Sequence, residues 1–302
     1  MAEPVLGGIA LSEKDRAEPV LRPGNTNCGG CGMSLALQLV RRALGGRPVQ
    51  MVIPACCGIV AAGQYPYSNF GVPIIASTFA STAAVASGLA WVAKLNNERT
   101  RVLCWAGDGG TYDIGMATLS AAAERNDDIL YLCYDNEIYG NTGGQGSSAT
   151  PLAASTTTTP GGKRVEKKDI LGIMAAHRIP YVATLSMAHL DDFMRKVRYA
   201  LDTEGTRFLH ILSPCPTGWK SEPSEGVALL RLAVRCGLYP VYEVFDGTRH
   251  VINVESELDR NALETYFSRQ GRYRHSEIST DTVYEAIKRH WRKLRQLART
   301  EP

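Results

Sequence analysis

The chain has 302 residues, 44% of them hydrophobic, which is enough to bury a large core as one α/β domain or a domain with appendages. A formal net charge of only +3, with no basic run interleaved with aromatic residues, gives no support for nucleic-acid binding. Acidic residues interrupt the first 21 positions and no apolar run approaches the ~20 residues of a membrane-spanning helix, so we expect a cytoplasmic protein without a signal peptide or membrane partner.

The chain is expected to open with an arm over residues 1–23, lying on a neighbouring subunit or left as a loose tail. The main domain then begins at residue 24 with a C-x-x-C motif, Cys28 and Cys31 among glycines, before a helix over Leu35–Leu44. Such a loop folds back without side-chain obstruction and can bind one metal or cluster. The motif alone fits a zinc site, a redox pair or two inert thiols equally well.

Two further cysteine segments follow predicted strands. Cys56 and Cys57 come after a short strand, Gln50–Ile53, and Cys215 comes after Phe208–Leu212. In a cytoplasmic protein, cysteines are more often thiols or ligands than disulfides. Because all three cysteine segments fall at strand ends or in loops leading into helices, one common location is plausible. The apolar surroundings of the remaining three predict buried structural thiols: Cys104, Cys133 and Cys236.

The small-residue segment Ser77–Lys94 predicts a helix that packs closely against the sheet or a subunit. After it comes the central strand–helix–strand unit of a parallel sheet. The apolar run Val102–Trp105 ends at a glycine-rich turn, a helical pattern follows, and a second apolar run covers Ile129–Tyr134. Ligands of open parallel sheets bind outside the carboxyl ends of such strands.

The residues at these two strand ends suit a diphosphate and a metal. Gly107, Gly109 and Gly110 let the backbone approach a bulky anion and adopt φ > 0 where needed, and the next helix directs its N–H groups there. Adjacent parallel strands would bring Asp108 close to Asn136, 28 residues later. Oxygen ligands of this kind suit Mg²⁺ bound to phosphate. The alternative is an ordinary strand–turn–helix with a surface Asp and Asn.

The rest of the chain continues the α–β alternation. Leu152–Arg164 is predicted as a polar loop, either a lid or part of an interface. Helices and strands then alternate to complete a doubly wound, mostly parallel α/β domain over residues 24–237. Residues 238–302, a hairpin and two helices, are expected to form a C-terminal appendage for contact with another subunit or an electron-transfer partner. The basic last helix either attracts an acidic partner protein or is a solvated face.

The motif GDG with an Asn 28 positions later resembles the thiamine diphosphate (TPP) and Mg²⁺ signature of TPP-dependent enzymes. The longer string DNEIYGNTGGQ over 135–145, with SATP over 148–151, is similar to the beta subunit of the 2-oxoacid:ferredoxin oxidoreductases, the pyruvate:ferredoxin family. The early CxxCG, the Cys after the next strand and the late PCPTGW resemble the same family. The resemblance implies a TPP-binding fold of the diphosphate-binding type, with TPP, Mg²⁺ and a 4Fe–4S cluster.

By this resemblance, Asn141 lies near the reactive thiazolium carbon, where it would stabilise an oxyanion; an Asn that caps a turn is the alternative. The Mg²⁺ ligands would be Asp108, Asn136 and the carbonyl of Ile138. The whole TPP and Mg²⁺ set comprises Gly107, Asp108, Gly109, Gly110, Asn136, Ile138, Asn141 and Thr142.

The same resemblance implies that Cys28, Cys31 and Cys215 ligate the cluster, together with one of two adjacent cysteines. Family members have a single Cys at this point. Counting from Cys31 favours Cys56, whereas matching Val60 and Tyr65-Pro66 favours Cys57, which we prefer.

The implied activity is oxidative decarboxylation of a small 2-oxoacid, with single electrons passing through the cluster to ferredoxin and coenzyme A usually accepting the acyl group. Since 302 residues hold one such sheet, a partner chain is expected to supply the activating Glu of a pyrimidine-binding domain, and a ferredoxin-like chain or domain to carry electrons. Pyruvate is the default substrate, with branched 2-oxoacids, aryl pyruvates and oxalate as alternatives. Ala80 and Ser81 replace the Glu-Asn pair that usually follows Phe79, which hints at an unusual substrate. The alternative functions are a TPP decarboxylase or carboligase without redox chemistry, and a non-catalytic binding module stabilised by a zinc ion.

Overall fold

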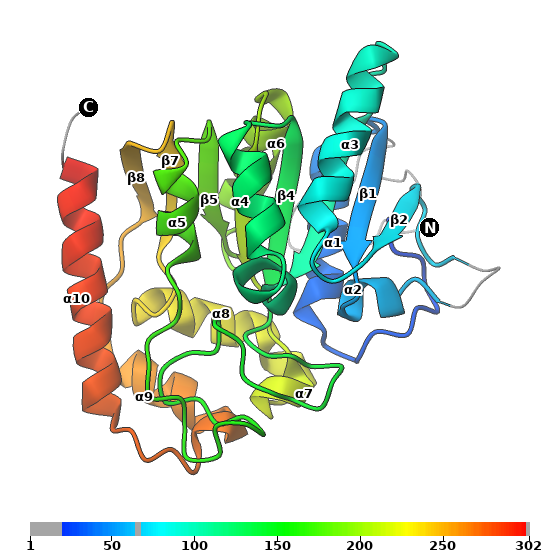
Figure 1. Cartoon of the computed structure of the whole chain (residues 1–302). Helices are drawn as coiled ribbons and strands as arrows, with labels where there is room; N and C mark the ends of the chain where they lie inside the picture. The colour runs from blue at the N-terminus through cyan, green and yellow to red at the C-terminus, as the bar shows by residue number, and fades with distance from the viewer. Residues whose placement is uncertain (1–19, 64–67, 300–302) are drawn as a thin grey trace, which may run out of the picture.

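An eight-stranded sheet runs through the molecule, and helices cover both of its faces (Figure 1). The structure is a computed structural model, and it describes residues 20–63 and 68–299. Most of the expected N-terminal arm, residues 1–19, and the Tyr65-Pro66 pair lie outside the described residues.

The sheet is parallel except at one edge. Its strand order is β2-β1-β3-β4-β6-β5-β7-β8, and the last two strands are antiparallel to their neighbours. In this order the strands are Ile74–Ser77, Val49–Pro54, Arg101–Gly107, Ile129–Asp135, Arg207–Leu212, Tyr181–Leu185, Val241–Phe245 and Arg249–Val254. The doubly wound, mostly parallel α/β fold predicted from the sequence is confirmed.

The helices form two layers on the sheet and a third group at its lower edge in Figure 1. On one face, α1 (Gly32–Leu44) packs against α6 (Leu190–Asp202). The other face carries α3 (Thr82–Leu95), α4 (Met116–Glu124) and α5 (Ile170–Ala176). Beyond the strand ends lie α7 (Pro216–Trp219), α8 (Gly226–Arg235) and α9 (Arg260–Ser268), while α2 (Cys57–Val60) follows β1.

The central strands are buried on both faces, which explains their continuous apolar runs. Every residue of β4 and β6 is buried. One prediction at the sheet edge is wrong: the helix expected from Ser77 begins only at Thr82, because Ile74–Ser77 forms β2. Small buried residues such as Ala83 and Ala86 bring α3 close to the sheet, as expected.

The C-terminal segment continues the main sheet. The expected hairpin is present, and its strand β7 pairs antiparallel with β5. The last helix, α10 (Thr280–Arg299), packs along β8 at the outer edge, where the indole nitrogen of Trp291 donates to the main-chain oxygen of Gly237 (2.8 Å). In the described part of the chain, no helix combines the length and apolar character needed to cross a bilayer.

Candidate active site

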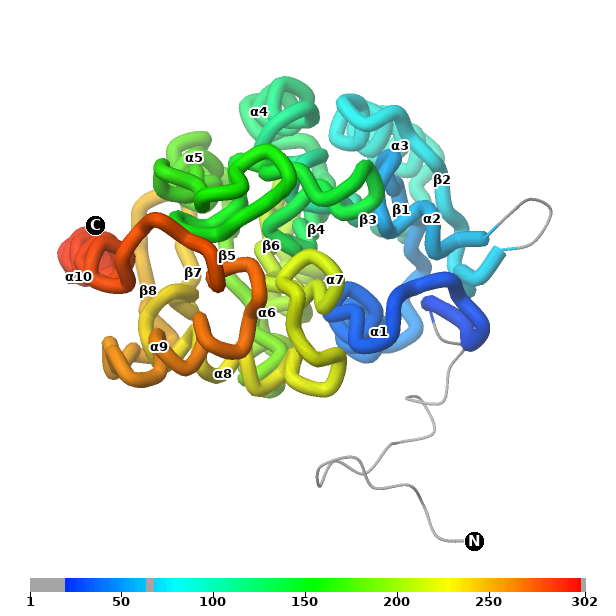
Figure 2. The backbone as a smooth tube through the Cα atoms, turned by 90° about the horizontal axis from the view of Figure 1, so that it is seen from below, coloured from blue at the N-terminus to red at the C-terminus, as the bar shows by residue number. Residues whose placement is uncertain are grey.

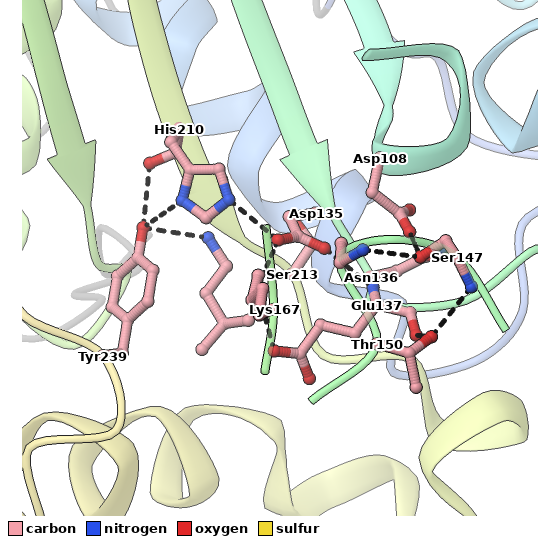
Figure 3. A network of polar contacts seen from close by, with 12 residues as sticks. Asp108, Asp135, Asn136, Glu137, Ser147, Thr150, Lys167, His210, Ser213 and Tyr239 are labelled. Carbon is pink, nitrogen blue, oxygen red and sulfur yellow. Dashed lines mark hydrogen bonds and ion pairs between the residues drawn. The ribbon is translucent and has the colours of Figure 1, made fainter. Parts of the chain in front are cut away.

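The first part of the site lies where β3 and β4 end. The two strands pair in parallel with Gly107 opposite Tyr134, so the residues that follow them leave the sheet side by side. Asp108 follows β3 and Asn136 follows β4. Figure 3 shows both residues below the strand ends, with Ser147 beside them. The structure therefore places next to each other the two residues that the sequence predicts as oxygen ligands.

The carboxylate of Asp108 is buried without an ion-pair partner among residues 20–63 and 68–299. It is 2% exposed, and its Oδ2 atom accepts a hydrogen bond of 2.5 Å from the hydroxyl of Ser147. Burial, and then the charge of Asp135, raise the pKa of Asp108 well above its usual range. An ionised carboxylate in this position is costly, and a divalent cation would compensate it. The donor set fits a hard cation such as Mg²⁺.

The glycines of this turn serve close packing. None of Gly107, Gly109 and Gly110 has a positive φ, because the chain passes from β3 directly into a π-helical turn over Gly109–Asp113. A Cβ on Gly109 would overlap the ring of Tyr139, and a Cβ on Gly110 would lie 3.1 Å from the ring of Phe79. The glycines therefore leave room for aromatic side chains and do not supply a positive φ, while their close approach to a bulky anion stays a prediction.

The turn Asn136–Ile138 is held in a defined conformation. Glu137 lies in the left-handed region, with φ 65°. Its N–H group donates to the side chain of Asp135 (2.9 Å), and the N–H group of Ile138 donates to the side-chain oxygen of Asn136 (3.3 Å). These bonds fix the directions of the main-chain carbonyl groups, as a main-chain metal ligand requires.

A buried ionic network lies directly behind this turn (Figure 3). Asp135 pairs with Lys167 (2.5 Å) and with Nε2 of His210 (2.8 Å), and Glu137 pairs with Lys167 (3.1 Å) and Arg272 (2.7 Å). Burial opposes the ionisation of Asp135, but Lys167 and His210 outweigh it and lower the pKa of Asp135. Burial lowers the pKa of His210 in spite of Asp135, so its imidazole is neutral. The two carboxylates and two cations therefore compensate each other.

The loop that follows Gln145 covers the turn. The hydroxyl of Ser147 donates to Asp108, and the hydroxyl of Thr150 donates to the main-chain oxygen of Glu137 (2.8 Å). Thr150 also accepts from the N–H group of Ser147 (2.9 Å). The loop thus connects the end of β3 with the turn after β4.

Lys163 also fixes the loop that follows Gln145. Its Nζ atom donates to the main-chain oxygens of Ser147 (3.2 Å), Ser148 (3.0 Å) and Thr150 (2.7 Å). The polar segment Leu152–Arg164, expected as a lid or an interface, therefore supplies a side chain that fixes the loop over the site.

The cysteines at the two ends of the main domain lie in neighbouring turns. The N–H group of Gly32 donates to the main-chain oxygen of Pro214 (2.9 Å), and Figure 2 shows α1 and α7 side by side. The hydroxyl of Thr217 lies 3.9 Å from the sulfur of Cys28, and the sulfur of Cys215 accepts from the N–H group of Gly218 (3.3 Å). The C-x-x-C turn thus packs directly on the turn that carries Cys215.

Of the two adjacent cysteines, Cys57 faces these thiols. Burial, and then the charges of Cys56, Cys215, Cys31 and Cys28, raise the pKa of Cys57 to about 12. The thiol of Cys56 instead contacts Tyr134 and nearby main chain, and burial raises its pKa. The two side chains diverge because Cys57 begins helix α2, whereas Cys56 precedes it in an extended conformation.

Asn141 lies beside the same thiol. The sulfur of Cys57 donates to the side-chain oxygen of Asn141 at 3.4 Å. Thr142 makes local contacts, because its hydroxyl donates to Oε1 of Gln145 (2.6 Å) and its main-chain oxygen accepts from Nε2 of Gln145 (2.7 Å). Both residues are exposed.

Several residues of the site have no motif in the sequence. His210 gives a weak signal, because a polar residue in a fully buried strand needs a partner. Ser147, Lys167 and Arg272 give none. Thr150 and Trp219 lie within the SATP and PCPTGW strings, but the sequence assigns neither of them a role. Over residues 20–63 and 68–299, no three His, Cys, Asp or Glu side chains are grouped to hold a single metal ion.

Known proteins are similar to this chain over most of its length. A family model described as "Thiamine pyrophosphate enzyme, C-terminal TPP binding domain" matches residues 55–211. The ketoisovalerate oxidoreductase subunit VorB of Pyrococcus furiosus is 38% identical over 287 residues, covering 91% of this chain and 92% of that protein. The pyruvate synthase subunit PorB of Methanothermobacter marburgensis is 42% identical over 264 residues, covering 85% and 91%.

A solved structure shows the same fold. The 2-oxoglutarate:ferredoxin oxidoreductase from Magnetococcus marinus, with 2-oxoglutarate, coenzyme A and succinyl-CoA bound, aligns with a TM-score of 0.60 and 22% identity, covering 88% of this chain and 94% of that one. Identities of about 40% to the PorB and VorB subunits, over most of each chain, show the family. The chain belongs to the TPP-binding beta subunits of the 2-oxoacid:ferredoxin oxidoreductases, and is an oxidoreductase subunit.

Proposed function

We propose that this subunit takes part in the TPP-dependent oxidative decarboxylation of a small 2-oxoacid, with ferredoxin as electron acceptor. One observation carries the proposal: the indole nitrogen of Trp219, in the turn that carries Cys215, donates to the main-chain oxygen of Asn136 (2.9 Å). The residues suited to Mg²⁺–TPP and those suited to a redox centre therefore belong to one connected site.

In this proposal Asp108, Asn136 and the carbonyl of Ile138 bind Mg²⁺, which holds the diphosphate of TPP. The buried Asp108 carboxylate, which forms no ion pair in the described part of the chain, supports this assignment. Gly107, Gly109 and Gly110 are proposed to form the diphosphate-binding turn, where the missing side chains leave room for the rings of Tyr134, Tyr139 and Phe79. TPP supplies the carbanion chemistry when bound, and the protein supplies orientation and electrostatics.

Asn141 would orient the substrate. Its neutral amide can donate a hydrogen bond to an oxygen that gains negative charge during the reaction. Its position in the sequence, five residues after Asn136, and its exposed side chain both suit contact with a bound molecule. Thr142 is proposed to line the same region.

Cys28, Cys31, Cys57 and Cys215 would ligate a 4Fe–4S cluster, which supplies one-electron transfer when bound. The thiols lie in neighbouring turns, and each of the other three raises the pKa of Cys57. Positive charge placed among them would stabilise the thiolates, as iron does. Cys56 has its contacts in the core and is not assigned as a ligand.

The substrate and partners follow from the relatives. Two of them are named for pyruvate and ketoisovalerate, so we propose pyruvate or a branched 2-oxoacid as substrate, with oxalate as a further candidate and coenzyme A as the acyl acceptor. A partner chain would supply the activating Glu of the pyrimidine-binding domain, and a ferredoxin-like chain or domain would carry the electrons onward.

The test uses enzyme purified anaerobically with its partner subunits. Viologen reduction across a panel of 2-oxoacids should identify the substrate, and iron and sulfide analysis should find a cluster on this chain. Asp108→Ala should abolish Mg²⁺–TPP retention with iron content near normal, whereas Cys215→Ala should lose or destabilise the cluster first and still retain some Mg²⁺–TPP. Activity without iron would instead indicate a TPP decarboxylase or carboligase, and full activity in both variants would refute both assignments.

A further inference from the structure

The turn that carries Cys215 is attached to the Asn136–Ile138 turn by two contacts. The indole nitrogen of Trp219 donates to the main-chain oxygen of Asn136 (2.9 Å). A Cβ on Gly218 would lie 2.8 Å from Cγ2 of Ile138, so the backbone at Gly218 packs directly on that side chain. The hydrogen bond is buried, and together the two contacts connect the turn at Cys215 with the turn at Asn136.

Arg272 closes this arrangement from the C-terminal segment. Its guanidinium lies 4.3 Å from the centre of the Trp219 ring, and its Nη2 atom lies 2.7 Å from Oε2 of Glu137, as an ion pair rather than an aligned hydrogen bond. The same guanidinium donates to Gln270 (2.9 Å) and to the hydroxyl of Tyr266 (3.2 Å). Arg272, Trp219 and Glu137 are all buried, so the guanidinium has a fixed place.

Glu137 is the residue on which these contacts act. Its left-handed backbone conformation is unfavourable for any residue other than glycine, and it persists only where the surrounding structure holds it. Arg272 and Lys167 bind its carboxylate, and the hydroxyl of Thr150 binds its main-chain oxygen. The conformation of Glu137 sets the directions of the carbonyl groups on either side of it.

We propose that Glu137, Trp219 and Arg272 form a clamp that positions the Asn136–Ile138 turn for Mg²⁺–TPP and couples this turn to the cluster-bearing turn at Cys215. These three are positioning residues. The inference rests on the proposed function, because it takes both cofactors as bound at these turns. Coupling between two sites is reciprocal, so bound Mg²⁺–TPP slows iron loss, and the intact cluster tightens Mg²⁺–TPP binding.

The test compares the wild-type enzyme, purified anaerobically with its partner subunits, with Trp219→Phe, Arg272→Met and Glu137→Gln. Two quantities are measured: the dissociation constant of Mg²⁺–TPP, and the rate of iron loss to a chelator with and without Mg²⁺–TPP. In the wild type, we expect Mg²⁺–TPP to slow iron loss at least about fivefold. Each clamp variant should weaken Mg²⁺–TPP binding about tenfold and lose most of this protection.

Trp219→Phe is the sharpest variant, because it keeps an aromatic ring near Arg272 while removing the N–H group that binds Asn136, together with the rest of the five-membered ring. Arg272→Lys keeps the charge but loses the planar guanidinium, and should restore part of the affinity that Arg272→Met loses. The matched control is Arg269→Met, the same change three residues earlier, where the side chain forms an exposed ion pair with Glu225 (3.1 Å). This control should leave both quantities unchanged.

The outcomes separate the clamp from the function on which it rests. A wild-type enzyme that binds neither Mg²⁺–TPP nor iron overturns the proposed function and the clamp together. If the wild type binds both and the three variants keep its affinity and protection, the clamp is refuted and the function stands. Variants with a lower melting temperature but unchanged affinity and protection, or with weaker Mg²⁺–TPP binding but unchanged protection, also refute the coupling.

Discussion

The sulfur of Cys57 lies 3.4 Å from the side-chain oxygen of Asn141, on the side of the site that faces the other three proposed cluster ligands. Cys56, one residue earlier, is directed into the core toward Tyr134. Two adjacent residues of the same chemical type thus occupy different environments, and only one of them faces the site.

Replacing Cys57 should therefore affect the cluster, and replacing Cys56 should not. Cys57→Ala is expected to lose or destabilise the cluster, because it removes one of four thiolate ligands. Cys56→Ala should retain iron, sulfide and the visible absorbance of the anaerobically purified enzyme, at a modest cost in stability. Iron loss in Cys56→Ala alone would reverse the assignment.

Removing the hydroxyl of Ser147 should weaken Mg²⁺ binding. Ser147→Ala takes away the hydrogen bond that orients the buried Asp108 carboxylate. The loss of such a bond to a charged group predicts an affinity about tenfold lower, measured by the Mg²⁺ dependence of viologen reduction at saturating TPP. The control is Ser148→Ala, because Ser148 is the next residue and contacts Asp113 through its main-chain N–H group. This variant should behave like the wild type. Equal Mg²⁺ dependence in both variants would contradict this role of Ser147.

Neutralising Asp108 should stabilise the metal-free protein while removing its response to Mg²⁺–TPP. Asp108→Asn keeps the shape of the side chain and removes a buried charge, so we expect the free energy of unfolding in EDTA to rise by about 1 kcal/mol. The melting temperature of the wild type should rise on addition of Mg²⁺–TPP, and that of the variant should not. A variant that is stabilised as strongly as the wild type would exclude Asp108 as a metal ligand.

Stability should fall as the pH drops below the ordinary imidazole range. Burial lowers the pKa of His210 from its usual 6.5, so the unfolded chain takes up this proton before the folded protein does. The contribution of His210 to the free energy of unfolding is therefore fully present above about pH 6.5 and is lost as the pH falls below it, by up to about 1.4 kcal/mol per pH unit for this one proton.

His210→Gln should flatten this dependence between pH 7 and pH 5, as measured by denaturant unfolding. The pKa values of His189 and His290 are also lowered by burial, but these residues are present in both proteins, so the difference between the two curves isolates His210. Parallel curves would show that His210 does not titrate on unfolding.

The periodicity of the sequence was sufficient to predict the central sheet. Strands such as β4 are apolar throughout because helices cover both faces, and this leaves a clear signal. The edge strand β2 was missed because it has four residues, all of them partly or fully exposed. Because β2 was not predicted, the helix α3 was expected to begin five residues too early, at Ser77.

The proximity of the two proposed oxygen ligands was predictable because parallel neighbouring strands end at the same edge, which places Asp108 beside Asn136. The clamp was not predictable, since Arg272 reaches Glu137 through a tertiary contact that no local pattern records. Lys167 lies in a polar stretch that resembles any surface loop, although its amine is bound between two buried carboxylates.

The late position of Arg272 in the chain also orders events during biosynthesis. Asp108, Asn136 and Glu137 leave the ribosome well before Arg272 does, so until residue 272 has been made Glu137 lacks one of the two cations that bind it in the folded protein. The support of the Asn136–Ile138 turn is therefore completed only when translation is almost finished. A product that ends prematurely before residue 272 would contain every recognisable motif and still lack the last support of the turn that we propose binds Mg²⁺.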